Sequence, residues 1–104
     1  MHAVYLDGVF DLFHASHLEF IKKVRQDAMK FFQVNEYDVQ IVVGIISDSD
    51  TETYKRTPVW NLSQRTRMLE QCKLVDKVVS GSPLHITKKF LDTHQIQLVY
   101  HADD

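Results

Sequence analysis

The chain has 104 residues, of which 44% are apolar and 25% are charged, and its formal net charge is -2. This length accommodates one domain, and the composition is that of a folded globular protein. The small negative charge argues against a general binder of nucleic acids or membrane surfaces, so an anionic ligand must be held by a local basic cluster. Cys72 is the only cysteine, which excludes an intrachain disulfide and favours a reducing, cytoplasmic location. The longest apolar run, IVVGII, is too short to span a membrane, and the first residues lack the pattern of a signal peptide.

The first half of the chain predicts a strand, a helix and a second strand. Ala3–Leu6 is short, apolar and β-prone, and an Asp-Gly pair ends it. Apolar residues at three- and four-residue spacings predict an amphipathic helix from Ala15 to Phe32. The β-branched run Val39–Ile46 is typical of a strand buried on both faces of a parallel sheet. The following SDSDTET is rich in cap and turn formers and predicts a turn.

The second half repeats this alternation. A basic loop containing Pro58 precedes a helix that we expect from Ser63 to Cys72, capped by Asn61 or Ser63. Strands that alternate with helices predict an α/β fold with a parallel sheet of four to five strands and helices on both faces. The remaining expected elements are a strand in DKVVSG that ends at Gly81, a helix from Thr87 to His94, and a last strand, Ile96–His101.

Polar clusters follow every predicted strand. Ligands of parallel sheets bind beyond the carboxyl ends of the strands, where the strand order reverses, so these clusters are expected to share one edge of the sheet. The clusters span Asp7–His17, Ser47–Arg56, Ser80–His85 and His101–Asp104.

The first cluster, DGVFDLFHASH, contains two histidines three residues apart. His17 falls in the first turn of the predicted long helix, and His14 lies in the loop that enters it. Backbone N–H groups and the helix dipole favour an anion there, and two imidazoles would add donors to phosphate oxygens. The alternative is a core His17, in phase with the apolar stripe, beside an ordinary loop residue. A zinc site is the weakest interpretation, because the pair needs further ligands that one cysteine does not supply.

A second basic cluster, TYKRTP, carries Lys55 and Arg56 after the second strand. Lysine is a suitable point charge for a loop that closes over a triphosphate, although a solvated surface pair has the same pattern. Arg65 and Arg67 on the next helix could serve similarly, with surface exposure as the default expectation for both.

Three segments together resemble the cytidylyltransferases that act on phosphocholine, phosphoethanolamine and glycerol 3-phosphate. YLDGVFDLFHASHLEF resembles the GxFDxxHxGH signature, SDSDTETYKRTPVWNLSQRTRMLEQCKLVDKVV resembles the family's central block, and IQLVYHADD is similar to its strand ending in His-Gly-Asp-Asp. The similarity runs in order from Ala3 to Asp104 and implies a Rossmann-like nucleotidyltransferase fold. It also implies transfer of CMP from CTP to a phosphomonoester such as phosphocholine or phosphoethanolamine, in phospholipid precursor synthesis.

The resemblance implies roles for individual residues. His14, His17 and Lys55 would be catalytic, by stabilising charge on the phosphates during in-line attack on the α-phosphorus. Mg²⁺ would assist the departing pyrophosphate, with no residue named as its ligand, and the chain would form a homodimer. The implied nucleotide-binding residues are Gly8, Val9, Phe10, His14, His17, Lys55, Arg65 and Asp103, and the implied substrate-binding residues are Asp11, Lys55, His101 and Asp103.

The sequence departs from the family pattern at several points. Ser16 replaces the glycine of HxGH, and Leu84 stands where choline-type members carry an aromatic residue that would contact a quaternary ammonium. We expect a single cytidylyltransferase-like domain over residues 1–104 that lacks the family's RTxGxST region. Two alternatives therefore stay open: a catalytically weak member that binds nucleotide or dimerises with a partner, and an enzyme that uses ATP.

Overall fold

The computed structural model describes residues 1–102, and Asp103 and Asp104 lie outside the described residues. Strands and helices alternate along the chain, as the sequence pattern predicts. The elements are β1 (His2–Gly8), α1 (Ala15–Phe32), the 3₁₀ turn η1 (Glu36–Asp38), β2 (Val39–Ile46), α2 (Asp48–Glu52), α3 (Leu62–Glu70), β3 (Lys77–Ser82), α4 (Lys88–Thr93) and β4 (Ile96–His101).

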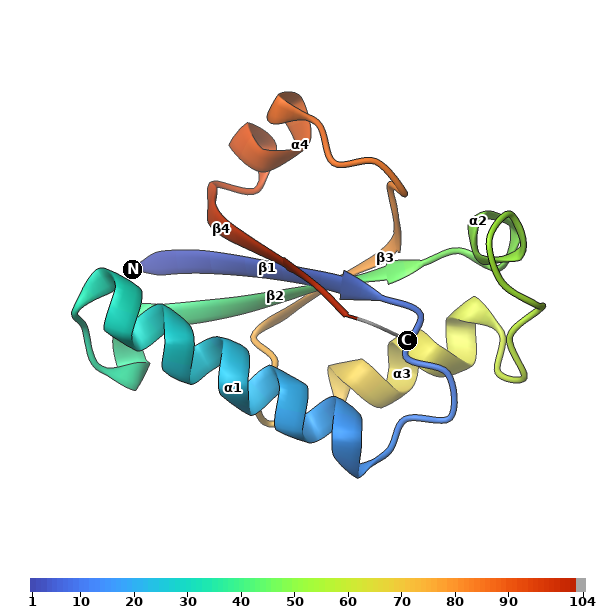
Figure 1. The fold of residues 1–104 in the computed structure, drawn as a ribbon, viewed down its shortest axis with the longest axis horizontal. Helices are drawn as coiled ribbons and strands as arrows, with labels where there is room; N and C mark the ends of the chain where they lie inside the picture. Colours follow the sequence, from blue (N-terminus) through green and yellow to red (C-terminus); the bar gives the residue numbers. More distant parts are fainter. Residues whose placement is uncertain (103–104) are drawn as a thin grey trace.

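The four strands form one parallel sheet in the order β3-β2-β1-β4. Helices α1 and α3 cover one face of this sheet, and α4 covers the other (Figure 1). The chain moves from β1 to β2 and β3 on one side and returns to place β4 on the other side of β1. The strand order therefore reverses between β1 and β4, and the expectation of a parallel α/β sheet with helices on both faces is confirmed.

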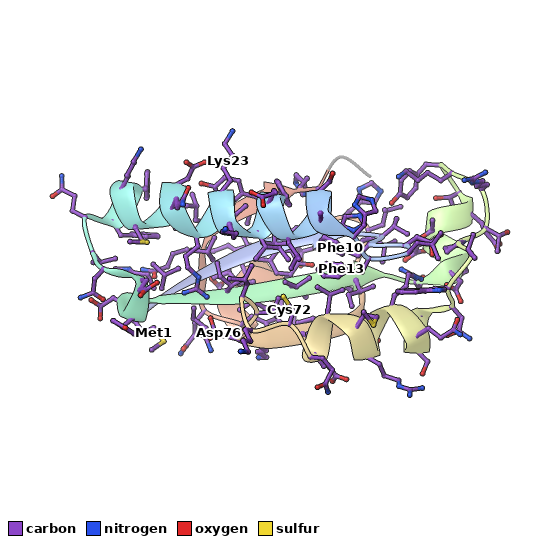
Figure 2. All side chains as sticks on the ribbon, turned by 90° about the horizontal axis from the view of Figure 1, so that it is seen from below. Met1, Phe10, Phe13, Lys23, Cys72 and Asp76 are labelled. Carbon is purple, nitrogen blue, oxygen red and sulfur yellow. The ribbon has the colours of Figure 1, made fainter. Side chains whose placement is uncertain are left out.

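The main hydrophobic core fills the space between the sheet and the pair α1 and α3. Alternate residues of β1 and β2 point into it, and α1 contributes its buried stripe at the expected helical spacing. Figure 2 shows Phe10 and Phe13 beside the first turn of α1, between that helix and α3. The segment that links β1 to α1 therefore belongs to the core as well as to the strand ends.

The observed elements differ most from the sequence-based prediction at two segments. The predicted turn after β2 is the short helix α2, because Ser47 caps it through a hydrogen bond to Asp50 N, and Asp48 and Asp50 complement the helix N-terminus. Helix α3 begins one residue before the expected Ser63 and ends at Glu70, with Asn61 as its cap. Among residues 1–102, none of the helices is long and apolar enough to cross a membrane.

Candidate active site

An open cavity of about 290 Å³ lies beyond the carboxyl ends of β1 and β2. One wall comes from the segment between β1 and α1, and the other comes from α2 and the loop that follows it. The cavity is lined by Val9, Asp11, Leu12, His14, His17, Thr51, Lys55, Arg56, Thr57, Pro58 and Val59. Of the nine different residues to which the sequence assigned a site role among 1–102, five line this cavity: Val9, Asp11, His14, His17 and Lys55.

The two histidines form the N-terminal cap of α1. His14 is the capping residue, and its Nδ1 accepts a hydrogen bond from Ser16 N at 3.2 Å. His17, at the third helical position, accepts a hydrogen bond from His14 N through its own Nδ1 at 3.1 Å. The two residues thus make a reciprocal capping box with imidazoles in place of the usual hydroxyl and carboxylate.

These hydrogen bonds fix the tautomer of both neutral rings. A backbone N–H can only donate, so the Nδ1 atoms of His14 and His17 must be unprotonated acceptors. The proton of each neutral imidazole therefore sits on Nε2. Because the cap engages the Nδ1 atoms, the N–H of each neutral ring is the Nε2–H, and a phosphate oxygen can accept a hydrogen bond from a group of this kind.

His17 is a buried residue that also lines the cavity, so its phosphate-binding role stays a prediction. Its side chain is only 6% exposed and packs among the rings of Phe10, Phe13 and His14, with the His14 ring stacked at a centroid distance of 4.0 Å. His17 nevertheless lines the cavity, whereas His14 is exposed at its rim. His17 is therefore part of the core and of the cavity lining at once, and packing holds its ring in place.

Basic side chains stand on the opposite wall. Lys55 and Arg56 are both exposed and follow α2, whose last turn holds Lys55 N through Thr51 O at 2.9 Å. Thr51 is buried and also lines the cavity, with its hydroxyl bonded to Ser47 O. Two imidazoles, an ammonium and a guanidinium thus line the same cavity, a set of donors that suits a polyanionic ligand.

Among residues 1–102, Asp11 is the one carboxylate that lines this cavity, and both of its oxygens accept backbone hydrogen bonds. Val59 N donates to one oxygen at 2.7 Å, and Trp60 N donates to the other at 2.8 Å. Burial raises the pKa of Asp11, but the hydrogen bonds from Trp60, Val59 and Leu12, together with the charge of Arg65, outweigh burial and lower this pKa below its usual value. The carboxylate is therefore anionic at neutral pH and joins the two walls.

Arg65 is fully buried, so the expectation of surface exposure for this residue is wrong. Its guanidinium donates to Val9 O and Ile46 O at 2.8 Å, and to Trp60 O at 3.0 Å. It also pairs with Asp48, from Nη2 to Oδ1, at 2.6 Å. Arg65 does not line the cavity, and direct contact with a nucleotide stays a prediction.

The other predicted site residues lie around the end of β1. Gly8 is buried at the end of the strand, and the Phe10 ring is buried in the core. The Nδ1 atom of His101 lies within hydrogen-bond distance, at 2.6 Å, of Oδ1 of Asp7, which is buried on the neighbouring strand. His101 itself is exposed and lies outside the cavity lining. The roles predicted for Asp103 fall outside the described residues.

The residues around the cavity do not offer Mg²⁺ a protein-built cage. Within residues 1–102, no group of three or more His, Cys, Asp or Glu side chains could hold a metal ion. Asp11 already accepts a backbone N–H at each oxygen. Mg²⁺ binds nucleotide phosphates readily, so the expected ion stays a prediction in which it arrives on the ligand and is not held by side chains.

Sequence reasoning missed two contributors to this site. Asp48 lies in the segment expected to be a turn, and nothing in its spacing marks it as the partner of Arg65. Thr51, which lies in the same segment, was also assigned no role from the sequence. A helical interpretation of residues 47–52 would have placed the Thr51 side chain one turn after Ser47, facing the same strand ends.

The sheet order, the helices on both faces and the position of the cavity define an α/β fold of the nucleotidyltransferase type. The Cytidylyltransferase-like family model matches residues 5–104, which is nearly the whole chain, and this protein belongs to that family.

Several curated relatives are similar along most of this chain. It is 39% identical over 100 residues to a probable choline-phosphate cytidylyltransferase of Schizosaccharomyces pombe, with 96% of this chain and 25% of the relative covered. It is 35% identical over 103 residues to the ethanolamine-phosphate cytidylyltransferase of Dictyostelium discoideum, with 97% and 26% covered. The human choline-phosphate cytidylyltransferase A is 37% identical over 100 residues, with 96% and 25% covered. The chain thus spans about a quarter of the length of these relatives.

A solved structure supports the fold independently. The lipopolysaccharide core biosynthesis protein from Thermoplasma volcanium GSS1 superposes with a TM-score of 0.74 at 20% identity, covering 95% of this chain and 72% of that one. At this level of identity the likeness concerns the fold alone.

Proposed function

We propose that this chain transfers CMP from CTP to a small phosphomonoester, phosphocholine or phosphoethanolamine, and releases pyrophosphate. Family membership and the names of the relatives support the reaction class. The observation that carries the proposal is the cavity itself, which His14, His17, Lys55 and Arg56 line together at the carboxyl ends of the strands. Four nitrogen-bearing groups on two walls suit a triphosphate better than a neutral ligand.

The reaction would need no covalent bond to the protein. A phosphate oxygen of the acceptor attacks the α-phosphorus of CTP, and the bond from that phosphorus to the oxygen bridging the α- and β-phosphates breaks. Pyrophosphate leaves with the electron pair of that bond. Catalysis of this kind rests on orientation and on stabilisation of the charge that gathers on the phosphate oxygens.

The side chains of the cavity match this requirement. The Nε2–H groups of His14 and His17 would donate to oxygens on one side of the phosphate chain. Lys55 would approach from the opposite wall and neutralise charge as the pyrophosphate departs. Because the cap already fixes the Nδ1 atoms, the two imidazoles are oriented before the nucleotide binds, which reduces the cost of ordering them.

The predicted homodimer and Mg²⁺ dependence belong to the same proposal. Analytical ultracentrifugation of the 104-residue chain tests the dimer. Adding a chelator during turnover tests the ion, and loss of activity that Mg²⁺ restores would support it. The cytoplasmic location stays a prediction from the sequence.

The deciding experiment measures pyrophosphate release by this chain with CTP and Mg²⁺. Phosphocholine, phosphoethanolamine and glycerol 3-phosphate are supplied in parallel as acceptors. We expect turnover with one of the first two, and a loss on the order of 100-fold or more in Lys55→Met, since a group that contacts reacting phosphates is worth several kcal/mol. Lys23→Met is the matched control, because Lys23 is exposed on α1, away from the cavity lining.

Each result has a distinct meaning. No release with any acceptor, from a folded sample that still binds CTP, would contradict turnover and favour the nucleotide-binding alternative. Equal release by Lys55→Met and Lys23→Met would contradict the role assigned to Lys55. Release with ATP in place of CTP would contradict the choice of nucleotide.

A further inference from the structure

We propose that Arg65 and Asp11 act together as positioning residues that hold the two walls of the cavity at a fixed separation. The inference deepens the proposed function, because the walls carry the histidine pair and Lys55. In this proposal Arg65 does not contact the nucleotide but acts through the backbone carbonyls that it binds.

Arg65 joins the ends of two strands to the far wall. Its Nη1 donates to Val9 O, just after β1, and to Ile46 O, at the end of β2. Its Nε donates to Trp60 O in the loop that follows Lys55. A planar guanidinium reaches such divergent carbonyls at once, whereas the single ammonium of a lysine cannot.

Asp11 holds the same loop from the other side. Its two oxygens accept from Val59 N and Trp60 N, so the Trp60 residue is held at its N–H by Asp11 and at its C=O by Arg65. Asp11 is two residues after Val9, whose carbonyl Arg65 also holds. The contacts therefore close a ring that runs from Arg65 through Val9 to Asp11, across to Trp60 and back to Arg65.

This ring connects the two segments that line the cavity. Asp11 is three residues before His14 on one wall, and Trp60 ends the loop that carries Lys55 on the other. Phe10, between the two held residues Val9 and Asp11, has a φ of 54°, and Leu12 has a φ of 47°. Residues other than glycine seldom adopt this left-handed region, and such strain persists where surrounding contacts enforce it. The ring supplies those contacts.

The same chain contains a matched arginine far from the cavity. Arg25 on α1 donates to Glu36 O, Val39 O and Leu74 O and pairs with Asp76. It ties the start of β2 to the segment before β3, at the opposite end of the sheet from the strand ends that line the cavity. Loss of either arginine removes several hydrogen bonds to carbonyls, but only Arg65 joins the cavity walls.

Trp60 reports on the ring without any need for activity, because it is the only tryptophan of the chain. The experiment uses the 104-residue protein with the variants Arg65→Lys, Asp11→Asn, their combination, and Arg25→Lys as the control. Acrylamide quenching of Trp60 fluorescence is measured without ligand at a temperature where all variants are folded. CTP affinity is then measured by calorimetry on the same samples.

We expect Arg65→Lys and Asp11→Asn each to increase quenching and to weaken CTP binding about tenfold or more, with the double variant no worse than the weaker-binding single variant. Such non-additivity follows because either change opens the same ring. Arg25→Lys should be less stable but should keep the contacts of the ring, so we expect its Trp60 quenching and its CTP affinity to be unchanged. Where turnover is detectable, kcat should fall on the order of 100-fold in Arg65→Lys, as expected for misplaced catalytic groups.

Other outcomes overturn the proposal. Unchanged quenching in Arg65→Lys, with CTP affinity lost additively with Asp11→Asn, would mean that Arg65 contacts the nucleotide directly. Equal effects of Arg65→Lys and Arg25→Lys would mean a role in stability alone. If Arg65→Lys does not fold, Asp11→Asn, which removes the other half of the ring's contacts to Trp60, provides the test through the same two measurements. If the unaltered chain binds no CTP, the proposed function fails while the quenching results still test the ring.

Discussion

His17 accepts a hydrogen bond from the backbone N–H of His14, and the two imidazoles stack with their centroids 4.0 Å apart. Helix α3 begins with the same reciprocal cap, but there the side chains are the amides of Asn61 and Gln64. Amides thus serve the capping purpose within this same chain. In α1 the cap is made by imidazoles, whose Nδ1 atoms accept the backbone hydrogen bonds, so the remaining ring nitrogens are the Nε2 atoms.

The first prediction separates the cap from the ligand site at His14. In His14→Asn the side-chain oxygen keeps the capping role, because asparagine is among the best capping residues, while the imidazole Nε2 is replaced by an amide NH2 on a shorter side chain. We expect the free energy of unfolding to stay within about 0.5 kcal/mol of the unaltered protein and pyrophosphate affinity to fall at least about tenfold. Urea denaturation and calorimetric titration with pyrophosphate measure the two quantities.

His14→Ala is the matched control for this prediction. It removes the cap as well as the donor, so about 1 kcal/mol of stability should be lost in addition to the affinity. Full pyrophosphate affinity in both His14→Asn and His14→Ala would show that His14 is only a cap.

The second prediction concerns the packing of His17. Its buried ring lies among Phe10, Phe13 and His14, whereas the His14 ring is exposed. His17→Ala should therefore cost about 2–4 kcal/mol, by analogy with the loss of a buried ring, and more than His14→Ala. Urea denaturation of the two variants checks the order. A smaller loss in His17→Ala would mean that the ring contributes little to the core.

Much of the fold could be predicted because local pattern and burial agree along this chain. The stripe of His17, Ile21, Val24, Ala28 and Phe31 marked α1 correctly; the first four are the buried residues of the helix, whereas Phe31 near its end is exposed. The β-branched run from Val39 to Ile46 marked β2 with its exact bounds, since a central strand buried on both faces leaves no polar alternation to confuse the pattern.

The site was harder to predict because its key contacts join distant segments through the backbone. Arg65 was expected at the surface, since a charged residue in a polar helix usually points to water. Its burial depends on carbonyls of Val9 and Ile46, which are 56 and 19 residues away and carry no side-chain signal in the sequence. The same holds for Asp11, whose partners are the N–H groups of Val59 and Trp60.

The third prediction is a pH dependence of the link made by Asp11. Hydrogen bonds and the charge of Arg65 lower the pKa of this carboxyl in the folded chain below 3.8, its ordinary value. A lowered folded pKa means that the stabilisation is fully present above the unfolded pKa and is lost as pH falls through the folded pKa. The difference in unfolding free energy between the unaltered protein and Asp11→Asn should thus be constant above about pH 5 and shrink below pH 4. A difference that stays constant down to pH 3 would contradict this assignment.

The last prediction concerns a buried tyrosine on the face covered by α4. Tyr5 is inaccessible to solvent, its ring meets Phe90 edge to face, and its hydroxyl lies over Gly44 and close to Ser82. Neither the Tyr5 nor the Ser82 hydroxyl has a hydrogen-bond partner within residues 1–102. Burial raises the pKa of Tyr5 to about 12, the nearby Ser82 hydroxyl opposes this rise, and the charge of Asp7 adds to it.

The sign of the effect follows from the raised pKa. The unfolded phenol ionises near its ordinary value of 10.0 and the folded one near 12, so the stabilisation is complete below pH 10 and disappears as pH rises through 12. In Tyr5→Phe, stability at pH 7 should be unchanged or slightly higher, because an unpartnered buried hydroxyl is removed. Between pH 9 and pH 11, the unaltered protein should lose about 1.4 kcal/mol relative to Tyr5→Phe, as measured by urea denaturation at each pH. Parallel loss in the two proteins would show that the Tyr5 phenol ionises as easily in the folded chain as in the unfolded one.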